Sequence, residues 1–312
     1  MKLLVAFGLL VLLGPFIAPY PAHQQFAAYP YAPPMPPHVM DSDGLHAPFA
    51  HPIRSVDPLE RRYEADVTRR VHGFAGETPW FLLGSDAVGR DVLSRVLIGA
   101  RLSLGMALLA TLGALLLGSV AGAAAAHAGG WIDTLLMRLA DFVIVLPGLY
   151  LVLALRGALP VALTERQVFA ALVLVLTLAG WPTVARGVRG ILIVEAGAEY
   201  AEAARALGAS PWRVIGRHLL PAARGFLGVQ ATLLVPAFVM SEATLSYVGL
   251  GFMSPSASWG TMLQDAATVQ ALTEAPWLLA PAGAIVCTIF AVHAVANRAG
   301  RPTNLVIQPQ AT

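Results

Sequence analysis

The sequence predicts an all-α integral membrane protein with six transmembrane helices, and its composition and its apolar segments support that prediction. Of the 312 residues, 57% are hydrophobic and only 12% are charged, whereas a soluble globular chain has about 25% charged residues. A chain so poor in charge cannot cover a water-facing surface. We therefore expect a lipid bilayer to be its solvent.

Six segments approach the roughly 20 apolar residues that a helix needs to cross a bilayer. The first follows Met1 and Lys2 like the apolar part of a signal peptide, but the prolines at its end make a poor cleavage site, so we expect residues 1–18 to be retained as a span. The second is uncharged over its whole length, and its Gly118 and Gly122 favour close helix packing. The segments are 3–18, 102–126, 135–155, 167–181, 226–249 and 276–296.

The distribution of basic residues predicts the orientation. An inside N-terminus places ten basic residues in cytoplasmic segments and two, Arg156 and Arg166, in short outside loops. Short cytoplasmic loops are enriched in Lys and Arg. We therefore expect both chain ends inside, with residues 298–312 as a cytoplasmic tail.

Several classes of function are excluded by residue counts. Lys2 is the only lysine, so the chain lacks the lysine with which a Walker A loop holds phosphates. The net charge of +2 is no sign of a nucleic-acid partner. The single cysteine, Cys287, rules out an intrachain disulfide and a cysteine-based metal site. We expect no metal and no cofactor in this chain; its histidines 38, 46, 51 and 72 match no common ligand spacing and are expected to be solvated.

Two outside segments follow the first span. Residues 19–84 form a proline-rich arm, which we interpret as an external cap or docking surface, with a short helix expected from Asp57 to Arg70. Residues 85–101 are expected to form an amphipathic helix at the membrane interface, with Asp91 and Arg95 paired four residues apart. The alternative, a solvated extension of the second span, stays open.

The third segment outside the membrane, residues 195–221, predicts two short helices joined by a bend. Glu199 and Glu202 suit the start of the first helix, and Gly208 suits its left-handed end. Ser210 then caps a second helix that begins at Pro211.

The surface of this segment suggests a partner. Ala203, Ala204 and Leu207 form a small-residue face that suits insertion into a groove, and Pro221 marks the end of the second helix or a kink. A loop helix with no partner is an equal alternative on these residues alone.

Here the sequence resembles a known family. Glu202-Ala-Ala, Gly208 six residues later and Pro221 thirteen after that match the EAA loop of ATP-binding-cassette (ABC) import permeases. Further motifs at 84–101, 129–138, 181–189 and 245–260 are similar to the C-type permease of the dipeptide/oligopeptide/nickel family. The resemblance implies a type I ABC importer permease fold, with a core at 102–297, in the bacterial inner (plasma) membrane.

The resemblance also implies partners and site residues. The EAA helix would dock on an ATPase, with contacts or hinges at Glu199, Glu202, Ala203, Ala204, Leu207, Gly208 and Pro221. It implies a homologous second permease, two ABC ATPases that bind the ATP, and a periplasmic substrate-binding protein. This chain would have no catalytic residues, and it would import peptides, a nickel chelate or another small solute. The tail from His293 to Pro302 departs from the family pattern because it contains no Asp.

Ionisable residues within the spans complete the candidates. Glu242 is expected to face the bundle interior or water, because a charge near a span centre costs about 3 kcal/mol. With Ser246 it is a candidate for the translocation path, and a hydrogen-bonded packing role is the equal alternative. Arg138 and Asp141 are expected to pair. An ion-coupled carrier and an intramembrane hydrolase are rival classes, but no internal repeat or catalytic histidine setting favours them.

Overall fold

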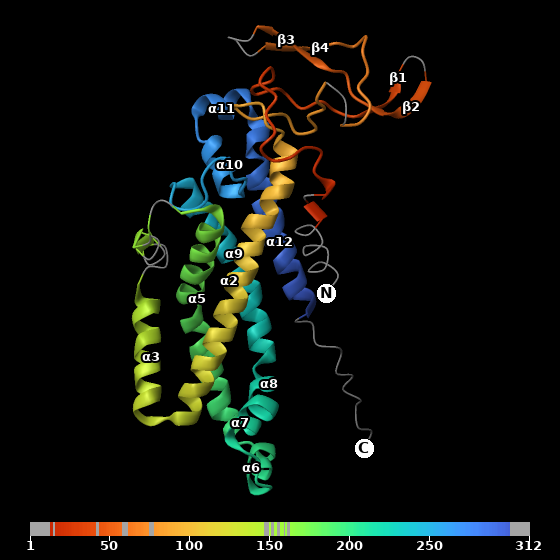
Figure 1. Cartoon of the computed structure of the whole chain (residues 1–312). Coiled ribbons are helices and arrows are strands. Elements are labelled where there is room, and N and C mark those ends of the chain that lie inside the picture. The colour runs from red at the N-terminus through yellow and green to blue at the C-terminus, as the bar shows by residue number, and fades with distance from the viewer. Residues whose placement is uncertain are drawn as a thin grey trace, which may run out of the picture.

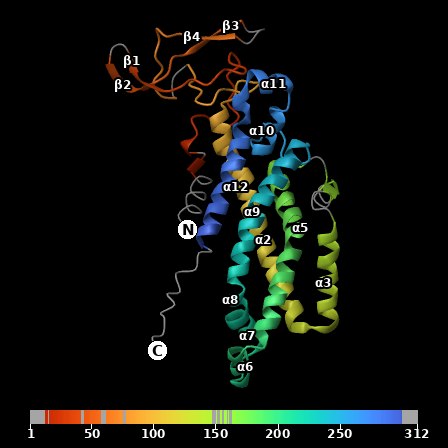
Figure 2. The ribbon, with the colours of Figure 1, turned by 180° about the vertical axis from the view of Figure 1, so that it is seen from behind.

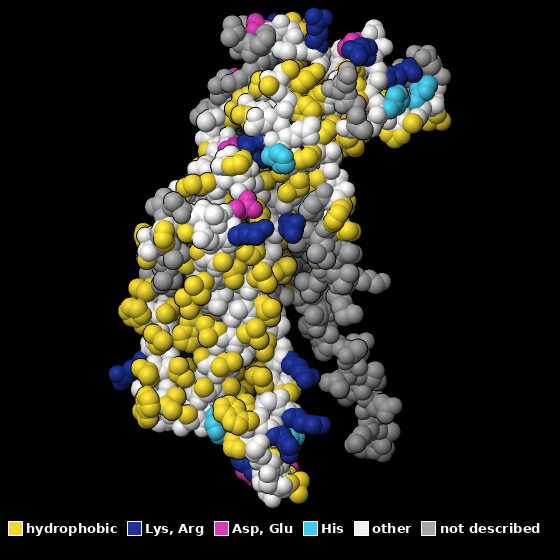
Figure 3. Space-filling view, viewed as in Figure 1, with side chains coloured by type: hydrophobic (Ala, Val, Ile, Leu, Met, Phe, Trp, Pro, Cys, Tyr) yellow, Lys and Arg dark blue, Asp and Glu magenta, His cyan; other side chains and the backbone are white. Residues whose placement is uncertain are grey.

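The computed structural model describes residues 13–299, apart from 15, 42–43, 58–61, 75–77, 147–149, 151–152, 155–156, 159 and 161–162. Long helices form an elongated bundle, with a module of short strands at one end and a group of short helices at the other (Figure 1). Between those ends, the face seen in Figure 3 is a broad belt of apolar side chains over the long helices. This is the surface expected of a protein in a bilayer.

Four helical segments in the described part of the chain are long and apolar enough to cross a membrane. They are α2 (Val92–Ala128), α5 (Glu165–Ala196), α9 (Arg224–Tyr247) and Pro276–Ala296, which joins the 3₁₀ turn η2 (Pro276–Leu279) to α12 (Ala280–Ala299).

The structure does not confirm all six expected spans. Most of the first span lies outside the described residues. The third begins as α3 (Gly130–Val145), which has 16 residues, and its continuation falls partly on undescribed positions.

Helices α2 and α5 pack side by side at the centre of the bundle (Figures 1 and 2). Glycines allow this approach: a Cβ on Gly118 would lie 2.5 Å from a Val184 carbon, and one on Gly122 would lie 2.4 Å from the Ala185 carbonyl oxygen. The Gly118–Gly122 motif therefore serves a contact within the chain. Helix α9 packs against α2 and α12.

Helix α2 differs from the expected arrangement, because it runs unbroken from Val92 to Ala128 and includes most of the separate helix predicted at 85–101. Asp91 caps it, accepting a hydrogen bond from the Ser94 amide at 2.8 Å. Residues 85–91 form a loop before this cap. No proline lies between Asp91 and Ala128, so the helix continues into the bundle.

The outer module is built from strands, so the all-α prediction is wrong here. Its two antiparallel hairpins are β1 (His38–Asp41) with β2 (Gly44–Phe49), and β3 (Ile53–Asp57) with β4 (Arg62–Ala65). The helix expected from Asp57 is absent, since Asp57 ends β3 and faces Arg62 across the hairpin. Buried Ile53 connects this hairpin to a core that contains Trp80 and Phe81.

Histidines of the module gather around the buried Phe49 ring. His72 is exposed, as expected, whereas His38, His46 and His51 are half-buried. The rings of four histidines lie between 5.4 and 6.1 Å from the Phe49 ring, measured between centroids: His38, His46, His51 and His72. Within the described residues, no three His, Cys, Asp or Glu side chains are placed to hold a metal ion.

Short helices complete the two ends. At the end away from the strands lie α6 (Glu199–Ala206), α7 (Pro211–Val214), the π-helical turn η1 (Ile215–Leu219) and α8 (Leu220–Ala222). Near the strands lie α10 (Trp259–Asp265) and α11 (Val269–Glu274). We call residues 199–222 the foot.

Candidate functional site

The bend of the foot forms as predicted at Gly208. Its φ is +79°, its amide donates to the Arg205 carbonyl at 2.9 Å, and the Ala209 amide donates to the Ala204 carbonyl at 3.0 Å. These two bonds are the Schellman pattern, which satisfies the last carbonyls of a helix and reverses the chain. The angle between α6 and α7 is therefore set by the backbone.

The second helix of the foot begins where expected but ends differently. Ser210 holds the cap position before Pro211, and its carbonyl accepts from the amides of Arg213 and Val214, while its side chain makes no capping bond. Pro221 does not end the helical path. It follows the π turn η1, and the chain continues through α8 into α9.

One side of the foot packs on the bundle. Ala201 is fully buried in a cluster with Val214, Ile215 and the α5 residues Val188 and Leu192. The α2 residues Ala123 and Ala126 pack against the same cluster. A cavity of about 290 Å³ lies between the foot and the ends of α2 and α5, and His127 is among its lining residues.

Polar contacts also tie α6 to the end of α5. Arg205 donates to the Ala196 carbonyl, and Tyr200 donates to the Glu195 carboxylate. This hydrogen bond to Glu195 raises the pKa of Tyr200 above its ordinary value. The foot is thus attached at several points along one face.

The other side of the foot is open. Of the predicted coupling residues, Glu199, Glu202 and Ala203 are exposed, Ala204 is half-buried, and Leu207 is 89% exposed. Trp212, five residues after Leu207, was not among the predicted site residues and is 75% exposed. The signal available in the sequence was a large aromatic residue directly after Ser210-Pro211, in a segment expected outside the membrane.

Glu242 and Ser246 occupy a fully buried site near the strand end of α9. The Ser246 hydroxyl donates to Glu242 Oε1 at 2.7 Å and accepts from the Phe252 amide at 3.0 Å. Gly260 packs against the same residue, since a Cβ there would lie 2.6 Å from the Ser246 Cβ. The pair therefore fixes the connection from α9 to α10 in this conformation. A role in lining the path stays a prediction.

The comparisons with known proteins give the family. Residues 114–299, more than half of the chain, match the family described as binding-protein-dependent transport system inner membrane component. The chain belongs to this family. The predicted resemblance to ABC import permeases is therefore confirmed, and the chain is a multi-pass inner-membrane permease whose family works with ATPase and substrate-binding partners.

Similar proteins support this assignment. The oligopeptide transport system permease protein OppC of Bacillus subtilis is 37% identical over 245 residues, which are 77% of this permease and 76% of the relative. The dipeptide transport system permease protein DppC of the same organism is 36% identical over 220 residues, covering 70% and 66%. A putative peptide permease protein of Brucella ovis is 35% identical over 219 residues, covering 70% of each.

A solved structure supports the fold. The inward-facing MetNI methionine ABC transporter contains a chain that matches this permease with a TM-score of 0.52 at 19% identity, covering 65% of the permease and 94% of that chain. The permease therefore has the fold of a type I ABC importer permease.

At its strand end the permease has a buried ionic network that the sequence did not predict. Arg95 is 1% exposed and donates to Asp86 at 2.5 Å and to Asp265 at 3.0 Å. Arg90 binds the same two carboxylates, at 2.6 and 3.1 Å. The expected Asp91–Arg95 pair is not formed; burial instead raises the pKa of Asp91 to about 6, against the opposing effect of its hydrogen bonds from Ser94.

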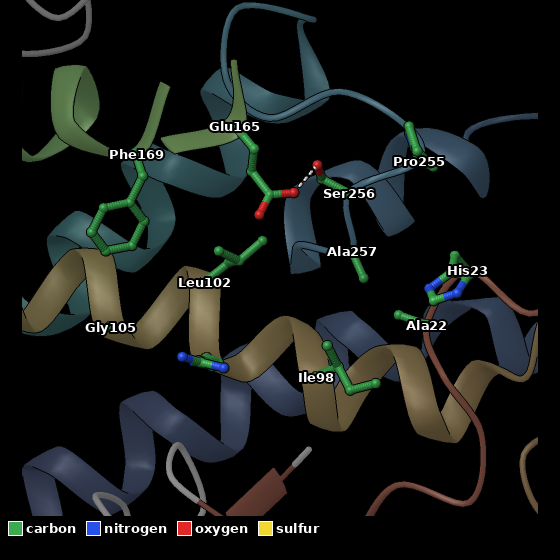
Figure 4. A pocket seen from close by; sticks show the side chains of 11 residues that line it. Ala22, His23, Ile98, Leu102, Gly105, Glu165, Phe169, Pro255, Ser256 and Ala257 are labelled. Carbon is green, nitrogen blue, oxygen red and sulfur yellow. Dashed lines mark hydrogen bonds between the residues drawn. The ribbon is translucent and has the colours of Figure 1, made fainter. Parts of the chain in front are cut away.

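The permease also has a cavity of about 810 Å³ near this end (Figure 4). Its walls come from α2, the start of α5, residues 255–257 and the segment that contains His23. Glu165 lies on one side, where it accepts a hydrogen bond from Ser256, and Arg101 also lines the cavity. Groups of both charges are thus present where solute in water can reach them.

The predicted pairing of Arg138 with Asp141 is wrong. Asp141 accepts a hydrogen bond from Arg186 of α5 instead. A second ion pair nearer the foot joins Asp133 of α3 to Arg189 of α5, at 2.5 Å. The hydrogen bonds from Arg189 lower the pKa of Asp133 at this end of α3. Two Asp–Arg pairs therefore join α3 to α5.

Proposed function

We propose that the chain is a C-type permease subunit of an ATP-driven importer of peptides. Relatives that align with this chain over most of their length are named oligopeptide and dipeptide permeases. These names support a peptide as the solute. A nickel chelate or another small solute is the alternative within this class. Six spans with both chain ends inside remain part of the proposal.

The observation that carries the proposal is the open side of the foot. Leu207 and Trp212 are large apolar side chains with 89% and 75% of their surface exposed, at the end of the molecule beyond the apolar belt. Large apolar side chains that stay exposed in a segment outside the belt are available to a protein partner. The backbone geometry at Gly208 and the packing of Ala201 hold that surface in one orientation.

The partner at the foot is an ATPase subunit in this proposal. The assembly contains this permease, a homologous second permease, two ABC ATPases and a periplasmic substrate-binding protein. The ATPases bind the nucleotide, which agrees with the absence of a P-loop lysine from this sequence. This chain has no cofactor and no catalytic residue, and it transmits the movement of the ATPases to its half of the path.

Substitution of Gly208 by Val tests the coupling. No atom lies within 4 Å of a Cβ placed there, so the strain comes from the positive φ alone, at a cost of about 1–3 kcal/mol. We expect substrate-stimulated ATP hydrolysis and uptake by the reconstituted complex to fall at least tenfold. The measurement is uptake and phosphate release in proteoliposomes.

Two matched variants make the test specific. Gly208→Asn should retain much of the activity, because Asn tolerates the left-handed region. Gly225→Val should be close to the unmodified complex, because Gly225 also has open space but lies in α9 without a positive φ. Unchanged coupling in Gly208→Val would contradict the proposed role, and uptake by the isolated chain in an ion gradient would favour a secondary carrier.

A further inference from the structure

Helix α3 carries a polar stripe along one side. Thr134, Arg138 and Asp141 follow one another at intervals of four and three residues, which places them on the same side of a helix. All three are exposed. The neighbouring side of α3 is apolar and equally open, with Leu135, Leu139 and Phe142 exposed at 58%, 50% and 65%.

The stripe extends onto α5, which runs beside α3 (Figures 1 and 2). Thr183 and Arg186 are exposed and lie three residues apart on α5. Arg186 forms the ion pair with Asp141, and the two side chains are still 51% and 55% exposed. We define the polar stripe as Thr134, Arg138, Asp141, Thr183 and Arg186.

The stripe lies at the depth of the apolar belt. Trp131 is 74% exposed near the foot end of α3, where an aromatic residue suits the membrane–water interface. Asp141 follows ten residues later, which is about 15 Å along a helix and half of a hydrocarbon core of about 30 Å. On α5, Arg186 lies ten residues before the helix end at Ala196, which is again about 15 Å along a helix.

Charged side chains at this depth do not face lipid, because nothing in hydrocarbon replaces their hydration. They are also not covered by the described part of the chain, since half of each side chain is open. Building on the proposed function, we propose that the polar stripe lines a water-filled conduit for solute. The apolar side of α3, by contrast, faces lipid or a neighbouring protein.

The charge of the stripe indicates which solute groups it favours. Asp141 neutralises Arg186, whereas Arg138 forms no ion pair with a described acidic residue. The stripe therefore carries one net positive charge. It favours anionic groups, such as the carboxylate end of a peptide, over cationic ones.

The chain is well suited to a cysteine-accessibility test because Cys287 is its only cysteine. In a Cys287→Ser background, single cysteines replace adjacent residues that differ in side but not in depth: Thr134 and Leu135, Arg138 and Leu139, Asp141 and Phe142. The assembled complex in proteoliposomes is treated with water-soluble methanethiosulfonate reagents, and modification of this chain is followed by mass spectrometry. Only a thiolate in contact with water reacts at an appreciable rate.

We expect each stripe position to react at least tenfold faster than its apolar neighbour. The pairs at Thr134 and Arg138 still give a result if the cysteine at Asp141, which removes an ion pair, disturbs the helix. Equal rates within all three pairs would overturn the inference. This outcome is independent of transport, so it is distinct from a complex that fails to take up peptide, which would contradict the proposed function instead.

Two reagents of opposite charge test the sign of the stripe. At Thr134→Cys, the anionic ethylsulfonate reagent should react faster than the cationic trimethylammonium reagent, after each rate is divided by its rate with free mercaptoethanol. Arg138→Gln should lower that ratio at least threefold, and Arg138→Lys should restore it. A ratio that does not respond to Arg138→Gln would overturn the assigned charge preference.

Discussion

The two ends of the permease use charged and apolar residues in opposite ways. At the strand end, two arginines and two aspartates form a network in which Arg95 is 1% exposed. At the foot, the charged residues Glu199 and Glu202 are exposed, and so is the large apolar residue Leu207. The strand end is thus linked internally, and the foot leaves its contact groups open.

The difference teaches what each end contributes. Burying charges costs free energy, and buried charges are stable only in an arrangement that pairs them and satisfies their hydrogen bonds. The network joins the loop before α2 to α10, far apart in sequence, so it fixes how these segments sit. An exposed apolar surface is unfavourable in water and its burial under a partner is favourable, which suits an end that binds another subunit.

The largest effect is expected when the network loses its central carboxylate. Asp86 accepts hydrogen bonds from Arg90, Arg95 and two backbone amides. Asp86→Ala leaves buried positive charge without its main partner and should destabilise the protein by about 3–5 kcal/mol. Thermal unfolding in detergent measures this. Asp265→Ala is the matched control, because its side chain is 28% exposed, and an equal loss in both variants would contradict the central position of Asp86.

A second test uses the buried cap residue Asp91. Its pKa is raised to about 6 in the folded protein, so the folded state binds this proton more tightly than the unfolded chain. Stability from this group is therefore present below about pH 4, falls as the pH rises to about 6, and stays about 3 kcal/mol lower above that. Asp91→Asn keeps the capping oxygen and removes the titration.

The difference in melting temperature between Asp91→Asn and the unmodified protein should thus grow from pH 4.5 to pH 7.5, with the variant more stable. Comparing the two proteins at each pH cancels the titration of other groups. A difference independent of pH would show that Asp91 keeps an ordinary pKa.

The smallest effect separates the two sides of the foot. Ala201→Leu overfills the buried contact with the bundle and should destabilise the protein by about 1–3 kcal/mol. Ala203→Leu, on the exposed side, should leave the melting temperature unchanged but weaken co-purification of an ATPase subunit. The reverse pattern would mean that the open side of the foot is not where the partner binds.

The foot was predictable from sequence because its determinants are local. Gly208 requires a particular backbone region, and Ser210-Pro211 starts a helix, so the bend follows from residues close together in the chain. The long spans were also predictable from hydropathy, as at α2. Of the predicted small-residue face of Ala203, Ala204 and Leu207, Ala203 and Leu207 are exposed and Ala204 is half-buried.

The strand end was not predictable, because its determinants are distant. Asp57-Pro58 suggested a helix start, but pairing of Ile53–Asp57 with Arg62–Ala65 prevailed through cross-strand contacts and the burial of Ile53. Arg95 was assigned to its helical neighbour Asp91, whereas its partner Asp265 lies 170 residues away. The pairing of Asp141 with Arg186 was missed for the same reason, since no local spacing relates two helices.

Helix α2 has a mechanical consequence. It begins one residue after the Asp91 cap and six after Asp86, and its far end brings the His127 ring to 6.0 Å from the Trp212 ring of the foot. With 37 residues it is a rod about 55 Å long. If the rod pivots near one end by about 5°, the other end swings by about 5 Å. A docking subunit that displaces Trp212 sideways would thus reposition the anchorage of Asp86 without any change inside the rod.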